Sequence, residues 1–169
     1  TIAIDCQPSV TMSAITGTGR SQWTGSENDA YCSIKTNNSD GYALTLKADD
    51  PNLTSASDTL NPITASDTPV TWDGTAVPTS SSGWGYRLST LSTIDDAKWG
   101  TDDQSNVDYG TTAKWYKATA SDYQIVAASS ETDNAGDSEI LNFGAEIGAG
   151  MIQPTGSYST TVTLTAVTL

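Results

Sequence analysis

Apolar residues alternate with polar or small residues in several short stretches of the chain. The clearest stretch is residues 42–47, where Tyr42, Leu44 and Leu46 share one face of an extended strand. The same two-residue period occurs at residues 2–6, 10–14, 84–88, 123–127, 143–151 and 158–166, and shorter strands are indicated at 32–34, 70–72 and 115–117. No stretch has the period of a helix. The pattern predicts an all-β fold, an antiparallel immunoglobulin-like β-sandwich of about eight strands with long loops, as one domain over residues 1–169.

Turn residues separate these stretches. Asp40-Gly41 follows the strand at 32–34 and precedes the strand at 42–47, which predicts a hairpin. Residues 49–83 are rich in Asp, Ser, Thr and Pro, and only residues 70–72 look like a strand there, so we expect a long surface excursion.

The charge balance excludes some partners. The chain carries 7 Lys and Arg against 20 Asp and Glu, a formal charge of -13, and its sequence pI is near 4.1. Binding of nucleic acid or an anionic membrane surface needs clustered basic residues, so neither partner is expected. No apolar run reaches the roughly 18 residues of a membrane span, and residues after Thr1 lack the pattern of a signal peptide. We therefore expect no membrane insertion.

The chain has no histidine. This composition excludes a Ser-His-Asp triad, a Cys-His pair and His-ligated metal sites. Glycoside hydrolysis needs only two carboxyl groups, and Glu146 between Ala145 and Ile147 occupies a place where a catalytic acid could lie. The alternative is that Glu146 is an ordinary solvent-exposed strand residue with no catalytic role. No catalytic constellation emerges, and we expect a protein that is not an enzyme.

Cys6 and Cys32 are the two cysteines of the chain, 26 positions apart. Each lies on or beside an expected strand. In a secreted protein they form a structural disulfide between the first two strands, which is the expectation here. A tetrahedral zinc site is disfavoured because two cysteines without histidine would have to recruit carboxylates.

Two acidic loops have the composition of a calcium site, which needs several oxygen ligands on a turning loop. One holds Asp102, Asp103 and Asp108, and the other holds Asp133 and Asp137. Neither has the spacing of an EF-hand loop, and solvated acidic loops are the alternative. No other cofactor is expected.

Five tryptophans divide into two groups. Trp84 and Trp115 lie in strand patterns and are expected in the core. Trp23, Trp72 and Trp99 lie beside or near glycines in expected loops, where their rings could form an exposed contact surface. Such rings bind sugars or anchor a protein interface, so a glycan or host-surface ligand is a candidate partner.

Two segments carry a family resemblance. Residues 153–166, a Pro-x-Gly-x-Tyr turn leading into a Thr- and Val-rich strand, and residues 38–48 resemble strands of bacterial surface β-sandwich proteins. These are pilin and fimbrial subunits and, distantly, WxL-type cell-wall domains. A Trp-x-Leu motif is replaced by Tyr42-Ala43-Leu44 and Leu164-Thr165-Ala166, so the wall attachment of WxL domains is not carried over. The resemblance implies a location on the bacterial cell exterior.

These observations favour a noncatalytic, extracellular structural subunit of a pilus-like filament that associates with its own copies, with adhesion as a further candidate role. Residues 1–5 are the candidate donor strand, with Ile2 and Ile4 as inserted side chains. An ordinary first strand within its own sandwich is an equal alternative. The other candidate functions are a carbohydrate-binding module and, third, a glycoside hydrolase.

Overall fold

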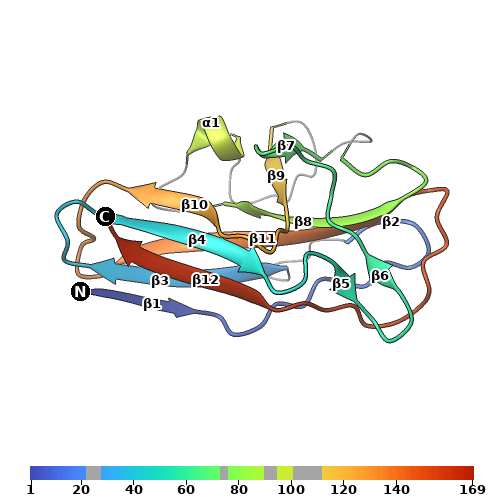
Figure 1. Cartoon of the computed structure of the whole chain (residues 1–169), viewed down its shortest axis with the longest axis horizontal. Coiled ribbons are helices and arrows are strands. Elements are labelled where there is room, and N and C mark those ends of the chain that lie inside the picture. The colour runs from blue at the N-terminus through green and yellow to red at the C-terminus, as the bar shows by residue number, and fades with distance from the viewer. Residues whose placement is uncertain (22–27, 73–75, 90–94, 101–111) are drawn as a thin grey trace.

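The computed structural model describes residues 1–21, 28–72, 76–89, 95–100 and 112–169. These form two antiparallel β-sheets packed face to face and a separate sheet of two short strands (Figure 1). The predicted all-β sandwich is confirmed. The large sheet has the strand order β1 (Ile2–Cys6), β3 (Asp29–Thr36), β11 (Asp137–Ile147), β8 (Ser82–Leu88), β9 (Lys114–Lys117) and β7 (Val70–Thr71), with β2 (Gly19–Arg20) paired to β11. The small sheet has the order β10 (Tyr123–Ala128), β4 (Tyr42–Ala48), β12 (Val162–Thr168).

The main core lies between the two sheets. The alternating faces predicted from the sequence point into it from both sides: Tyr42, Leu44 and Leu46 from β4, and Trp84, Tyr86 and Leu88 from β8, each exposing no more than 1% of its surface. Strand β11 crosses the middle of the large sheet and adds Leu141, Phe143, Ala145 and Ile147. Burial of these side chains is the main driving force for bringing the sheets together.

The predicted hairpin at Asp40-Gly41 is wrong. Strands β3 and β4 belong to different sheets, so this turn carries the chain from one sheet to the other. Gly41 has a φ of +85°, and a side chain there would collide with the carbonyl group of Ala128. The glycine is needed both for its backbone conformation and for this close approach.

Residues 49–83 are also more structured than a surface excursion. They contain β5 (Leu53–Thr54), β6 (Thr59–Leu60), β7 and the start of β8. Ile63, Trp72, Ala76 and Val77 pack with Trp115 in a second hydrophobic cluster on the outer side of β8. A methyl group added to Gly83 would lie 2.9 Å from Val77 Cγ2, so the glycine lets this segment lie close to the sheet.

Several strand boundaries differ from the prediction. Residues 10–14 form no strand, β11 begins at Asp137 and ends at Ile147, and β12 begins at Val162. In β10 the register with β4 shifts between Gln124 and Val126, which is the sign of a β-bulge. Ile125 and Val126 are both buried and Ala127 is exposed, so the expected single face of residues 123–127 is interrupted.

The one helix of the described residues, α1 (Asp96–Trp99), has four residues. Across the described ranges, no helix has the length and apolar character required to cross a lipid bilayer.

Candidate functional site

The tryptophans predicted as an exposed contact surface are buried where the structure describes them. Trp72 exposes 1% of its surface and Trp99 none, so that prediction is wrong for both residues. Trp23 lies outside the described residues. Trp84 and Trp115 are in the core as predicted. A sugar-stacking surface therefore has no support from Trp72 or Trp99.

Trp72 belongs instead to a polar cluster on the outer face of the large sheet. Its indole Nε1 donates a hydrogen bond of 2.6 Å to Oε2 of Glu146, and its ring meets Trp115 edge-on with centroids 4.9 Å apart. Arg20 pairs with the same Glu146 oxygen at 2.8 Å and donates through Nη2 to the Trp72 carbonyl at 3.2 Å. Glu146 is thus held by an ion pair and an indole, and it is not a simple solvated strand residue.

A row of buried polar residues crosses the same outer face. The strand register places Asp29 opposite Asn142 and Asn142 opposite Arg87. Asn142 Nδ2 donates to Asp29 Oδ1 at 2.6 Å, and the Arg87 guanidinium lies 5.9 Å from the ring centroid of Trp115. Tyr31 lies two residues after Asp29 on β3 and exposes 46% of its surface, and its pKa is raised by partial desolvation and by Asp29. These residues fix the relative positions of β3, β11 and β8.

The candidate calcium residues are only partly described. Asp102, Asp103 and Asp108 lie outside the described residues. Asp133 Oδ1 accepts hydrogen bonds from the backbone N–H groups of Ala135 and Gly136, at 2.8 and 2.9 Å. This carboxylate closes a turn before β11, and calcium binding there stays a prediction.

Asp137 takes part in a different contact, inside the sandwich. The hydroxyl group of Tyr42 lies 3.0 Å from Asp137 Oδ2 and 3.2 Å from Oε1 of the fully buried Glu139. Burial raises the pKa of Tyr42 well above its usual value, and the carboxylates of Glu139 and Asp137 raise it further. The phenol is therefore a hydrogen-bond donor between two carboxyl groups. Within the described ranges, no three Cys, Asp or Glu residues gather as a metal site.

Cys6 and Cys32 form the predicted disulfide. The two residues lie directly opposite each other on β1 and β3. The bond therefore links the C-terminal end of β1 covalently to β3, and residues 1–5 lie on the N-terminal side of this link.

Strand β1 is an edge strand of its own sheet. The sequence allowed two places for residues 1–5, in a neighbouring copy as a donor strand or in their own sandwich, and this structure of a single copy has the second. Gln7 N donates to Tyr31 O at 2.9 Å, and hydrogen-bonded pairs alternate with non-bonded pairs in an antiparallel ladder. The backbone groups of Ile2, Ile4 and Cys6 consequently point away from β3. Ile2 is half-buried against the main core, and Ile4 exposes 38% of its surface.

Strand β12 is an edge strand of the small sheet and lies beside β1 on the same side of the sandwich (Figure 1). Asp49 N donates to Thr161 O at 2.9 Å, and Leu169 N donates to Gly41 O at 3.2 Å. By the same alternation, the odd-numbered residues bond to β4. The N–H and C=O groups of Val162, Leu164, Ala166 and Thr168 therefore point outward. We call β1 and β12 together the open side.

The opposite edge of the small sheet is covered. Helix α1 lies over β10, where Lys98 Nζ donates to the Gln124 carbonyl and Trp99 Nε1 donates to the Ile125 carbonyl at 3.2 Å. Lys98 Nζ also lies 4.4 Å from the ring centroid of Tyr123, which stacks on Tyr116 with centroids 3.8 Å apart. Side-chain donors thus occupy carbonyl groups that another strand would need.

Comparison with known proteins gives no relative: no family model, no curated protein and no solved structure matches the chain.

Proposed function

We propose that this chain is a noncatalytic structural subunit of a bacterial surface filament, joined to its neighbours by strand exchange. The observation that carries the proposal is the position of β1. It is a five-residue edge strand that ends at the Cys6–Cys32 disulfide, and its outer backbone groups point away from its own sheet.

Strand exchange needs a segment that can leave its sheet without unfolding the domain. Residues 1–5 meet this need because only Ile2 among them packs against the main core, while Ile4 is exposed. The disulfide holds Cys6 in place, so the chain pivots there while β3 and the main core stay intact. The vacated place beside β3 then accepts residues 1–5 of the next copy, with the same backbone bonds.

Charge sets a condition on assembly. Each copy carries a formal charge of -13, and like charges repel over a screening length of about 10 Å at 0.1 M salt. Filament formation is therefore expected to increase with salt concentration. The disulfide and the resemblance of residues 38–48 and 153–166 to bacterial surface sandwiches support an extracellular location.

The test is negative-stain electron microscopy of the full chain over a series of protein and salt concentrations, beside a variant that lacks residues 1–5. We expect filaments from the full chain and none from the deletion variant. A synthetic peptide of residues 1–5 should bind the deletion variant, measured by fluorescence anisotropy.

Matched substitutions separate strand exchange from loss of charge or length. Ile2→Asp places a carboxylate on the core-facing side of β1, whereas Ala3→Asp places it on the exposed side. The first variant should lose filaments and the second should keep them. Filaments of normal length from the deletion variant would refute assembly through β1.

A further inference from the structure

The open side contains a strand with no charged side chain. From Ile147 to Leu169 the sequence has 23 residues and not one Asp, Glu, Lys or Arg, although 16% of the chain is charged and 16% of 23 residues is about four. Strand β12 lies in this segment and consists of Val, Thr, Leu and Ala alone. This is the longest uncharged segment of the sequence. A second acidic chain can approach it without repulsion between charged side chains.

The edge of β12 has the geometry to bind another strand. Its outward N–H and C=O groups belong to four residues spaced by two: Val162, Leu164, Ala166 and Thr168. Seven residues of strand extend about 24 Å, which is long for an edge without Pro, Lys or a bulge. Val167 exposes 46% of its surface on the outer face, and Val162, Leu164 and Ala166 are only half-buried.

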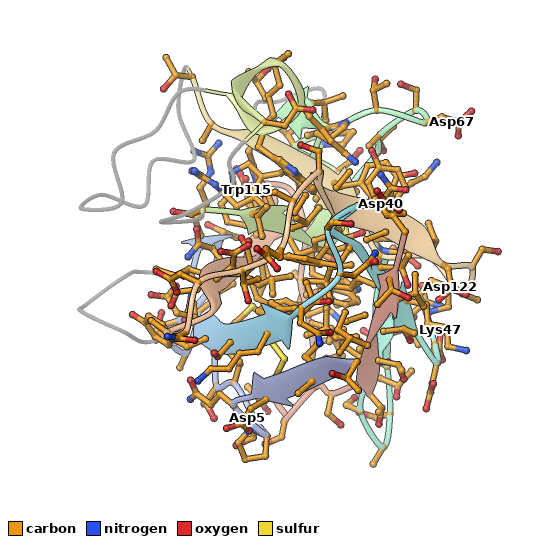
Figure 2. All side chains as sticks on the ribbon, turned by 90° about the vertical axis from the view of Figure 1, so that its left-hand side faces the viewer. Asp5, Asp40, Lys47, Asp67, Trp115 and Asp122 are labelled. Carbon is orange, nitrogen blue, oxygen red and sulfur yellow. A yellow bond between two sulfur atoms is a disulfide. The ribbon has the colours of Figure 1, made fainter. Side chains whose placement is uncertain are left out.

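Two other edges, β10 and β1, carry features that oppose strand addition. Side chains of α1 cover β10, and β1 has five residues, bears Asp5 and is followed by Pro8. Figure 2 shows Asp5 at the outer margin of β1. Charged residues and proline are the devices by which proteins block edge-to-edge pairing, and β12 has neither.

We propose that β12 pairs with β12 of a second copy of this chain, antiparallel and across a two-fold axis. The small sheets of the two copies then join into one sheet of six strands, in the order β10-β4-β12-β12-β4-β10. An identical strand satisfies the outward groups of both copies at once, and neither β12 carries a charged side chain. The inference deepens the proposed function by adding a second subunit contact, and it rests on that function only in requiring self-association.

Amide hydrogen exchange followed by NMR at low and high protein concentration tests the pairing. At high concentration, exchange at Val162, Leu164, Ala166 and Thr168 should slow by about tenfold or more as new backbone bonds form. Exchange at Thr163, Thr165 and Val167 should not change, because these amides already bond to β4. Equal rates at both concentrations, or slowing at Ile2 and Ile4 instead, would overturn the proposal.

A pair of lysine substitutions tests the same contact by sedimentation velocity. Thr165→Lys places a charge on the exposed outer face of β12, and Gln124→Lys places the same charge on the same face at the covered edge. Both reduce the net negative charge, so a purely electrostatic effect would favour association equally. With residues 1–5 deleted from both variants, so that strand exchange through β1 is absent, we expect the first variant to stay monomeric and the second to dimerise as the parent deletion variant does. Dimerisation of both variants would contradict pairing through β12.

The two proposals fail in different ways. Slowed exchange along β12 without filaments would refute the filament and leave the β12 pair. Filaments that persist in Thr165→Lys, with no concentration-dependent exchange along β12, would refute the β12 pair and leave strand exchange through β1.

Discussion

Two buried tyrosines offer a matched test of how hydrogen bonding contributes to this fold. Tyr42 and Tyr86 lie on facing sheets, and both are fully buried. The Tyr42 hydroxyl lies between the carboxyl groups of Asp137 and Glu139, at 3.0 and 3.2 Å. Among the described residues, the Tyr86 hydroxyl has no hydrogen-bond partner, and it lies among the rings of Trp99, Tyr116 and Phe143.

Replacing each tyrosine by phenylalanine removes one oxygen and leaves the ring in place. A hydrogen bond to a charged group contributes about 1.5–3 kcal/mol to stability, so Tyr42→Phe should lower the free energy of unfolding by that amount. A buried hydroxyl without a partner costs about 1–3 kcal/mol in desolvation. Tyr86→Phe removes this cost and leaves a gap of one oxygen atom. The net change should lie between zero and a stabilisation of about 1 kcal/mol.

Urea unfolding followed by tryptophan fluorescence measures both changes in one buffer at neutral pH. The m-value should be the same for the two variants and the unmodified chain, because the surface exposed on unfolding hardly changes. The midpoints should move in opposite directions, or only that of Tyr42→Phe should move. Equal destabilisation by the two substitutions would refute the reasoning, since ring packing rather than the hydroxyl contacts would then decide stability.

Further predictions concern the disulfide, the Trp72 cluster and high pH. Replacing both Cys6 and Cys32 by alanine opens a 26-residue loop and should lower the unfolding free energy by about 3.5 kcal/mol in urea titrations; a loss under 1 kcal/mol would contradict this. Trp72→Phe removes the indole donor to Glu146 and should cost about 1.5–3 kcal/mol, while Glu146→Gln should cost less than Trp72→Phe because an amide oxygen still accepts from the indole and from Arg20. Burial, with smaller effects of Tyr116, Asp67 and Asp95, raises the pKa of Tyr123 to about 12. Above about pH 10 the folded state therefore binds more protons than the unfolded state. The contribution of the Tyr123 phenol to the free energy of unfolding is complete below that pH and is lost as the pH rises toward 12. Urea midpoints at pH 9 and pH 11 should show the fall, and Tyr123→Phe should reduce it.

The sequence predicted the fold class and the best strands because alternation reports directly which face of a strand is buried. Tyr42, Leu44 and Leu46 face the core as expected, and so do Trp84, Tyr86 and Leu88. Pairing between strands is a separate matter. The Asp40-Gly41 turn has the local chemistry of a hairpin, but the main core places β3 and β4 in opposite sheets, and alternation carries no information about which strands are neighbours.

The tryptophans show the limit of reading exposure from neighbours in the chain. Glycines near Trp72 and Trp99 indicated loops, and both residues do lie outside the long strands. Their burial comes from distant partners: Glu146 and Trp115 for Trp72, and the edge of β10 for Trp99. The polar row of Asp29, Asn142 and Arg87 was missed for the same reason, because its members meet only through the register of β3, β11 and β8.

The disulfide was predictable because only two cysteines exist and both lie near strands. The open side was not, since an edge is a property of the whole sheet. One signal for it was present in the sequence: the absence of charge from Ile147 to Leu169.

The disulfide also determines how the domain would carry tension. A pull on residues 1–5 would peel β1 from β3 only as far as Cys6, where the covalent bond transfers the load to Cys32 in the middle of β3. The 25 residues from Gln7 to Tyr31 lie outside this path, so about 80–90 Å of extended chain cannot be drawn out while the bond is oxidised. In force spectroscopy, reduction of the disulfide should add this length to the contour released on unfolding. If residues 1–5 join one copy to its neighbour, tension would therefore pass through this short segment and the disulfide directly to β3 in the large sheet.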